Sequence, residues 1–119
     1  MGRLRKAQRL SGQDRFRAVL RTPAIVRRPS VEGYARPNEL GFARLGIVIG
    51  RKAARRAVDR NQCKRWVREQ FRAAQFNLAG LDVVLRFRPG REGRTGGGAH
   101  SEVIEVLSAI ARCRDSLSA

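Results

Sequence analysis

Two runs of aliphatic and β-branched residues flank a long two-faced helical pattern, and this arrangement limits the folds open to the chain. Residues 45–49 (Leu-Gly-Ile-Val-Ile) and 81–87 (Leu-Asp-Val-Val-Leu-Arg-Phe) have the composition of buried strands. Between them a helical pattern runs from about residue 55 to residue 76, and Gly80 is placed to end it. A strand, helix, strand unit of this kind normally crosses over with a right-handed connection.

The N-terminal third gives weaker signals. Ser11 is a suitable helix N-cap, and the apolar residues after it recur at helical spacing, so a short helix is predicted over about 12–21. Pro23 ends that helix. Residues 24–36 predict two short strands or one bent edge strand, because Pro29 interrupts the run.

The C-terminal third predicts a loop and a helix. Residues from about 88 to 100 are rich in Gly and Arg and predict a flexible loop, whereas apolar residues recur at helical spacing over 101–114. A chain of 119 residues has room for one core. We therefore expect a single domain over 1–119, of the α+β class, built as an α/β two-layer sandwich of one sheet and its helices.

The charge of the chain is large and unevenly placed. It has 26 Lys and Arg against 10 Asp and Glu, a formal net charge of +16. Residues 1–28 carry nine basic and one acidic residue, and residues 44–72 carry ten and two, so each stretch contributes +8 and together they supply the whole excess. A coat that serves only solubility normally mixes both signs. The distribution therefore predicts a binding face for a polyanion.

The predicted central helix concentrates its cations on one side. At about 100° per residue, five cations and one amide fall within an arc of about 140°; they are Arg60, Asn61, Lys64, Arg65, Arg68 and Arg72. The packing side is expected to comprise Cys63, Trp66, Val67, Gln70 and Ala74. Like charges one turn apart disfavour a helix unless a polyanion neutralises them. We expect this stripe to bind nucleic-acid phosphates and not to support the fold.

Little in the sequence could catalyse a reaction unaided. The acids are scattered, without D-x-D or H-x-x-E spacing, and His100, the only histidine, falls in the predicted loop. Cys63 and Cys113 are fifty residues apart with no C-x-x-C, so we expect reduced thiols and no metal site. No apolar run approaches the ~20 residues that span a bilayer, and no secretory signal is visible, so a soluble cytoplasmic protein is expected.

The basic helix carries a family resemblance. Arg60-Asn61, Lys64-Arg65 and Arg68-Glu69 resemble the signature R-N-R-x-K-R-x-x-R-E of the bacterial ribonuclease P protein component. Over roughly residues 8–112 the family's order is matched by Arg9-Leu10 and Phe16, Arg44-Leu45-Gly46-Ile47 and Lys52, Ala57-Val58, and Asp82-Val83-Val84. Two positions depart: Gln62 stands where the motif usually has Arg, and Leu20 stands where an aromatic residue is common.

This resemblance implies a fold and a division of labour. The implied fold is like the second domain of ribosomal protein S5, with a left-handed βαβ crossover around the basic helix, against the usual handedness. The implied function is that of the protein subunit of ribonuclease P, an endoribonuclease that removes the 5′ leader of precursor tRNA. In such a holoenzyme the catalytic RNA carries out hydrolysis with Mg²⁺, which is bound mainly by the RNA subunit, and the protein alone binds no cofactor. The implied partners are this RNA and precursor tRNA.

The resemblance also implies two sites on this chain. Contacts with RNA from the basic helix and the strand exit would be made by Arg51, Lys52, Arg56, Arg60, Asn61, Lys64, Arg65, Arg68 and Arg72. A cleft for the leader would be lined by Phe16, Leu20 and Tyr34, where aromatic faces stack on unpaired bases. Without the resemblance, core packing is the simpler interpretation of Phe16 and Tyr34.

Two other classes of protein share some of these features. A structural ribosomal or ribosome-assembly RNA-binding protein would have the charge, the size and an S5-like fold, but would not need the R-N-x-x-K-R-x-x-R-E helix. A DNA-binding protein would be basic as well, but the sequence shows no helix-turn-helix spacing. The RNA that accompanies the protein would separate these classes.

Overall fold

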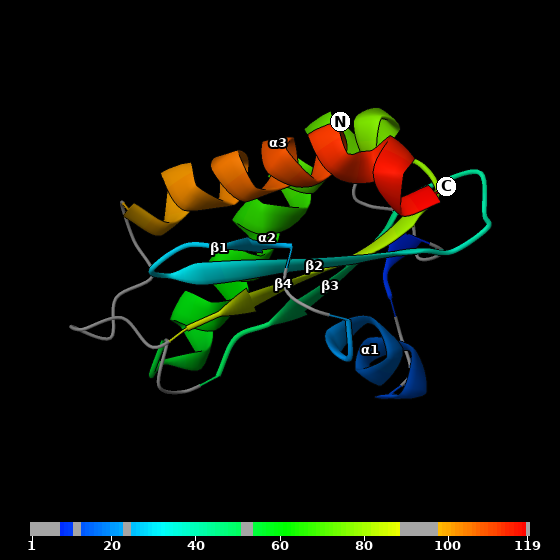
Figure 1. Cartoon of the computed structure of the whole chain (residues 1–119). Coiled ribbons are helices and arrows are strands. Elements are labelled where there is room, and N and C mark those ends of the chain that lie inside the picture. Colours follow the sequence, from blue (N-terminus) through cyan, green and yellow to red (C-terminus); the bar gives the residue numbers. More distant parts are fainter. Residues whose placement is uncertain (1–7, 11–12, 23–24, 51–53, 89–97, 119) are drawn as a thin grey trace.

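The computed structural model describes residues 8–10, 13–22, 25–50, 54–88 and 98–118. Its elements are α1 (Gln13–Leu20), β1 (Val26–Arg27), β2 (Val31–Pro37), β3 (Arg44–Val48), α2 (Ala57–Ala74), the 3₁₀ turn η2 (Gln75–Leu78), β4 (Leu81–Phe87) and α3 (Gly98–Ser118). The described strands form one four-stranded sheet in the order β1-β2-β4-β3 (Figure 1). Because β4 pairs antiparallel with β2 and parallel with β3, the sheet is mixed and the fold is α+β, as the sequence predicts.

The strand β4 is the centre of the fold. Its residues Leu81, Val83, Leu85 and Phe87 belong to the core on one face of the sheet, and Val84 belongs to a smaller cluster on the other face. Successive strand residues point to opposite faces, so a strand covered on both sides must be apolar on both. This explains why residues 81–87 form a nearly continuous apolar run.

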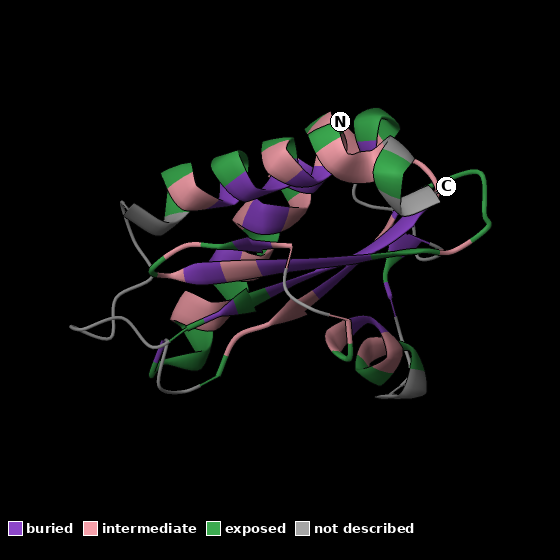
Figure 2. Cartoon of the chain, in the orientation of Figure 1, coloured by how far each residue is buried: buried purple, intermediate pink, exposed green. Residues whose placement is uncertain are grey.

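The helices α2 and α3 cover one face of the sheet and enclose the larger core (Figures 1 and 2). Val67 and Phe71 of α2 and Val106 of α3 are fully buried there. The helix α3 packs closely on β2, as shown by Gly33, where an added Cβ atom would clash with Val106 Cγ1. None of the helices that the structure describes is long and apolar enough to cross a membrane.

The helix α1 lies on the opposite face of the sheet (Figure 1). Its Val19 is buried in a second cluster with Leu10, Tyr34 and Val84, and Phe16, Leu20 and Val48 pack against that cluster. We call these seven residues the α1 cluster. The predicted two-layer sandwich is therefore incomplete, because α1 adds a partial third layer.

Other differences from the sequence prediction concern the ends of the chain. Two separate strands form where one bent edge strand was the alternative, and β2 is an inner strand because β1 pairs along its outer side. The helix α3 begins at Gly98, so residues 98–100 are helical and not part of a loop. Residues 89–97 of the predicted loop, and the predicted N-cap Ser11, lie outside the described residues.

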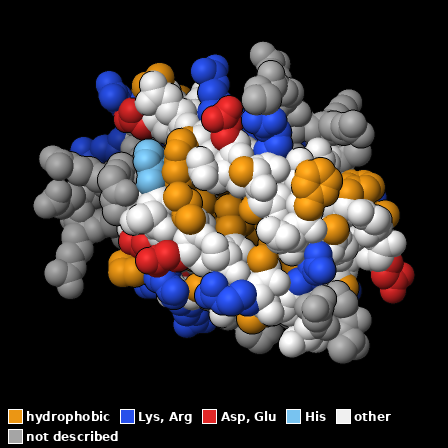
Figure 3. All heavy atoms as spheres, turned by 90° about the horizontal axis from the view of Figure 1, so that it is seen from above, with side chains coloured by type: hydrophobic (Ala, Val, Ile, Leu, Met, Phe, Trp, Pro, Cys, Tyr) orange, Lys and Arg blue, Asp and Glu red, His pale blue; other side chains and the backbone are white. Residues whose placement is uncertain are grey.

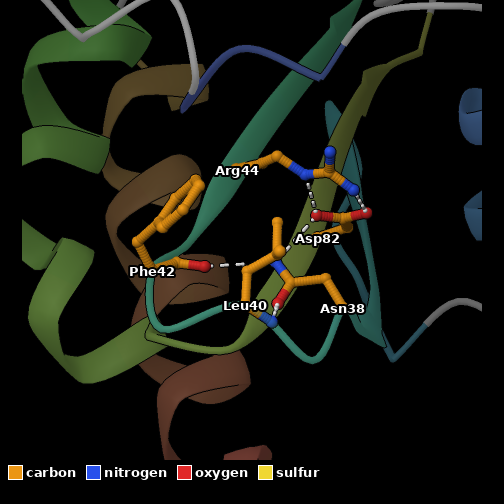
Figure 4. Close-up of polar contacts among 5 residues, drawn as sticks. All are labelled: Asn38, Leu40, Phe42, Arg44 and Asp82. Carbon is orange, nitrogen blue, oxygen red and sulfur yellow. Dashed lines mark hydrogen bonds and ion pairs between the residues drawn. The ribbon is translucent and has the colours of Figure 1, made fainter.

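A polar network fixes the connection between β2 and β3 (Figure 4). Arg44 donates from Nε to Asp82 Oδ1 at 2.7 Å and from Nη2 to Asp82 Oδ2 at 2.6 Å, across the parallel β3–β4 pair. Asn38 Nδ2 donates to Asp82 Oδ1 and to the Phe42 carbonyl, while the Leu40 amide donates to Asn38 Oδ1. The hydrogen bond to Asp82 raises the pKa of Arg44 above its ordinary value. The loop from residue 38 to residue 42 is thus tied to the sheet.

Candidate RNA interface

The basic helix α2 is rotated relative to the sequence prediction. Its buried residues are Cys63, Val67 and Phe71. At about 100° per residue, Phe71 falls between Arg60 and Lys64, inside the predicted basic arc. The predicted packing side is therefore only partly right, because it omits Phe71 and includes Trp66, Gln70 and Ala74, which are half-buried. The spacing of four residues from Cys63 to Val67 to Phe71 is the signal that identifies the buried stripe.

This rotation places the basic stripe along the flank of the buried stripe instead of opposite to it. Asn61 and Arg65 are exposed, and Arg60, Lys64, Arg68 and Arg72 are half-buried. Half-buried cations keep their head groups near the surface while their stems cover apolar neighbours. These six α2 residues therefore form one accessible surface, the basic strip or α2 strip.

One predicted member of the set is paired with an acid, and two others cannot be placed. Arg56 is exposed just before α2 and forms an ion pair with Asp59, with Nε 2.8 Å from Oδ2. That pair raises the pKa of Arg56 and lowers the pKa of Asp59. Arg51 and Lys52 lie outside the described residues.

Arg60 contributes to the local structure, contrary to the expectation from sequence. Its Nη1 donates to the carbonyl oxygens of Ala54 and Arg55, each at 2.9 Å. The N-cap position of α2 has no side-chain hydrogen bond of its own. Arg60 therefore ties the segment before α2 to the helix, and its Nη1 donors are occupied there while its charge remains.

Arg68 brings the second basic stretch of the sequence to this surface. Burial, and to a lesser degree the charge of Arg9, lowers the pKa of Arg68 below its ordinary value. Arg9 pairs with Leu45 at the outer edge of β3, and the Leu10 amide donates to the Leu45 carbonyl at 2.8 Å. The N-terminal segment thus runs beside the basic strip. Arg9 is not among the RNA-binding residues predicted from the sequence, although the net charge of residues 1–28 and the family match at Arg9-Leu10 pointed to that part of the chain.

The three residues predicted to line a leader cleft lie together in the α1 cluster. Tyr34 is 7% exposed, whereas Phe16 and Leu20 are half-buried and keep accessible surface. The ring of Phe16 covers Gly46 in β3, and Leu10 lies on the same glycine. Core packing therefore describes Tyr34, and Phe16 and Leu20 combine packing with an exposed apolar face.

The segment at residues 8–10 connects the two sites. Arg9 is exposed beside the basic strip, and the next residue, Leu10, is buried in the α1 cluster. The Gln8 side chain donates to the Gln75 side chain at the end of α2. Residues 8–10 therefore contact both the end of α2 and the α1 cluster, and they run along the β3 edge between these two surfaces.

The acids, histidine and cysteines of the described residues do not gather in one place. No group of three or more His, Cys, Asp and Glu among them is placed to hold a metal ion. Asp59 and Asp82 are engaged by arginines, and His100 stacks on Trp66 with ring centroids 3.9 Å apart. Burial raises the pKa of the Cys63 thiol, which disfavours the reactive thiolate. Mg²⁺ therefore finds no fitting ligand set on this part of the chain.

The faces of the molecule differ in character. Figure 3, which views the molecule from the α2 and α3 side, shows apolar side chains near the centre with cations and acids around them. Between α3 and the turn that joins β1 to β2, Glu105 pairs with Arg28, and the Glu102 side chain accepts from the Ser30 amide. These acids hold the β1–β2 hairpin to α3. On α2, by contrast, Lys64, Arg65 and Arg68 have no ion-pair partner among the described residues.

Comparisons with known proteins agree with this arrangement. The ribonuclease P family model matches residues 4–111. The ribonuclease P protein component of Chromobacterium violaceum is 39% identical over 116 residues, which cover 98% of this chain and 96% of the relative. The ribonuclease P protein of Thermotoga maritima has a TM-score of 0.60 and 25% identity, with 98% of this chain and 97% of that chain covered. The Staphylococcus aureus protein, at 22% identity, has a TM-score of 0.65 and covers 90% of this chain and 92% of its own, which shows the shared fold. The chain therefore belongs to the ribonuclease P protein component family, the protein subunits of an endoribonuclease holoenzyme.

Proposed function

We propose that this chain binds the catalytic RNA of ribonuclease P through the α2 strip and the 5′ leader of precursor tRNA through the α1 cluster. The observation that carries the proposal is the accessible group of Asn61, Lys64, Arg65 and Arg68 on the α2 strip. No acid lies between residues 61 and 68, and Glu69 follows directly after them. Clustered guanidinium groups suit phosphate oxygens, which they bind through paired hydrogen bonds. Binding a polyanion there relieves the repulsion among these like charges.

In this proposal the RNA subunit carries out hydrolysis and binds the Mg²⁺ ions. The described acids do not converge on a metal site, so the chain's own residues bind, orient and neutralise. Cations on α2 reduce repulsion between the phosphates of the two RNAs. The protein thereby lowers the Mg²⁺ concentration that the RNA needs for cleavage of precursor tRNA.

The α1 cluster supplies the surface for the leader. Phe16 and Leu20 are half-buried above Tyr34, so each offers one accessible apolar face. Unpaired bases stack on such faces with little regard for their sequence. Leaders of different sequence can therefore be bound by the same surface. Leu20 stacks less well than an aromatic ring, so Phe16 carries most of this contact.

We also propose that the fold is like the second domain of ribosomal protein S5, with a left-handed crossover from β3 through α2 to β4. In support, β3 and β4 are parallel neighbours joined through α2, which is the connection that such a crossover needs. An experimental structure tests this, because a right-handed connection would contradict it.

The function is tested with the purified protein and a bacterial ribonuclease P RNA. The protein alone should leave precursor tRNA intact at every Mg²⁺ concentration, and in the mixture it should raise cleavage at low Mg²⁺. Cleavage at the mature 5′ end by protein that has been treated with nuclease to remove RNA would contradict the proposal. Purification from its own cells adds a second readout: one RNA of several hundred nucleotides supports it, whereas ribosomal RNA indicates a ribosomal role.

A further inference from the structure

The sheet face under α1 is organised in rows of register partners. Val84 is paired with Tyr34 on one side and Gly46 on the other, and Phe16 covers this row at Gly46. The next row on the same face lies two residues further along β4 and comprises Arg27, Glu32, Arg86 and Val48. Two strand residues span about 7 Å, so this row is adjacent to the α1 cluster.

On β4, the second row is open to solvent at Arg86. In Figure 1, α1 lies under one half of the sheet, away from the C-terminal end of β4. Arg86 is exposed, although Leu85 and Phe87 on either side of it are buried. Val48 in the same row is half-buried and packs against the α1 cluster. The apolar surface at α1 therefore continues onto Val48 and meets a cation at Arg86.

The charges on this row leave Arg86 available. Glu32, whose side chain is 13% exposed, is its direct neighbour on β2 but forms an ion pair with Arg27, at 3.4 Å. In the described part of the chain, no hydrogen bond or ion pair engages the Arg86 side chain. An exposed guanidinium presents a fork of N–H donors that matches two phosphate oxygens.

We propose that Arg86 binds a phosphate of the single-stranded leader, next to the nucleotide that stacks on Phe16. The proposal rests on the proposed leader site and extends it by one row of the sheet. A base on Phe16 places its neighbouring phosphate over this second row, where Arg86 is the cation without an acidic partner and Val48 the apolar floor. Arg86 is a positioning residue, since it holds the leader and does not touch the bond that is cleaved.

The experiment compares Arg86→Ala with Arg112→Ala in the holoenzyme reconstituted with a bacterial ribonuclease P RNA. Arg112 is exposed on α3, which lies on the other side of the sheet, so the two variants lose the same charge at different places. Dissociation constants are measured for mature tRNA and for precursors with leaders of increasing length. Arg86→Ala should weaken binding of long-leader precursors about threefold to tenfold, leave mature tRNA unchanged, and flatten the salt slope for long leaders by about 0.7. Arg112→Ala should change none of these.

The variants separate this inference from the function on which it rests. If Arg86→Ala matches Arg112→Ala at every leader length while Phe16→Ala still selectively weakens leader binding, Arg86 has no such role and the leader site stands. Equal losses for mature tRNA and long-leader precursor would also overturn it. A parent holoenzyme that binds mature tRNA and long-leader precursor with the same affinity would overturn both proposals. Arg86→Gln, which keeps a polar side chain of similar shape on the strand, checks that any loss follows the charge.

Discussion

The ring of Phe16 in α1 lies directly against the backbone of Gly46 in β3. A Cβ atom on Gly46 would be 2.5 Å from Phe16 Cε1 and 2.6 Å from Phe16 Cζ, and 3.3 Å from the nearest atom of Leu10. Such separations are too short for any side chain to be accommodated without movement. The glycine therefore allows α1 to dock on the sheet, and so positions the α1 cluster.

Gly46→Ala should displace the Phe16 ring and destabilise the protein by about 1–3 kcal/mol, as overpacking does. Chemical denaturation of the protein measures this change, and affinity for leader-bearing precursor should fall with it. Gly50→Ala is the matched control, because nothing lies within 4 Å of a Cβ there. A Gly46→Ala variant as stable as the parent would show that Phe16 is not held by this contact.

Phe16→Ala should weaken the binding of leader-bearing precursor more than the binding of mature tRNA. Loss of one stacked base costs ~1–3 kcal/mol, which corresponds to a several-fold to hundredfold loss of affinity. Phe16→Leu retains apolar packing and removes the aromatic face, so it should show the same selectivity with the fold intact. Equal losses for both substrates would assign Phe16 to the core alone.

Single substitutions on the α2 strip should divide into two classes. Arg60→Ala loses two hydrogen bonds to backbone carbonyls and should destabilise the fold by about 1 kcal/mol. Arg68→Ala removes a cation that is close to Arg9 and should leave the melting temperature unchanged or raise it. Each should flatten the dependence of log affinity for the catalytic RNA on log salt by about 0.7 to 0.9. A lower melting temperature for Arg68→Ala than for Arg60→Ala would contradict the assignment of a structural role to Arg60 and not to Arg68.

Asp82→Asn should destabilise the protein strongly. The Arg44 and Asp82 side chains are 15% and 10% exposed, so the substitution leaves a largely buried guanidinium without its counter-charge, at a cost of about 3 kcal/mol. Asp59→Asn breaks an exposed pair and should leave the melting temperature nearly unchanged. Thermal melting of the two variants side by side makes the comparison, and equal melting temperatures would mean that the Arg44–Asp82 pair contributes little.

The two thiols should differ in reactivity. Burial raises the pKa of Cys63, so at a given alkaline pH less of it is thiolate, and the half-buried Cys113 should react first with an alkylating reagent. A raised folded-state pKa also means that this group's contribution to stability is present at neutral pH and is lost as the pH rises through that value. Mass spectrometry of partly alkylated protein locates the label. Faster labelling of Cys63 in the folded protein would contradict its burial.

Local patterns in the sequence determined which segments form helices and strands, and they determined the sign of the charge on the binding partner. The run at 81–87 is apolar on both faces and is the central strand, and the surplus of cations over 44–72 and 1–28 predicts a polyanion. The motif on the basic helix pointed to the family. These features arise from residues that are close together in the sequence, so they can be recognised without knowledge of the fold.

Only the tertiary structure decided how these parts face one another. Helical spacing placed Phe71 on the basic arc, but the direction of the core is set by the sheet and α3, which turn Phe71 inward and move the cations to the flank. The positions of α1 beneath the sheet, Arg9 beside Arg68 and Arg86 beyond the α1 cluster follow from strand order and register. Contacts between residues far apart in sequence arise from packing the whole chain, and no local pattern encodes them.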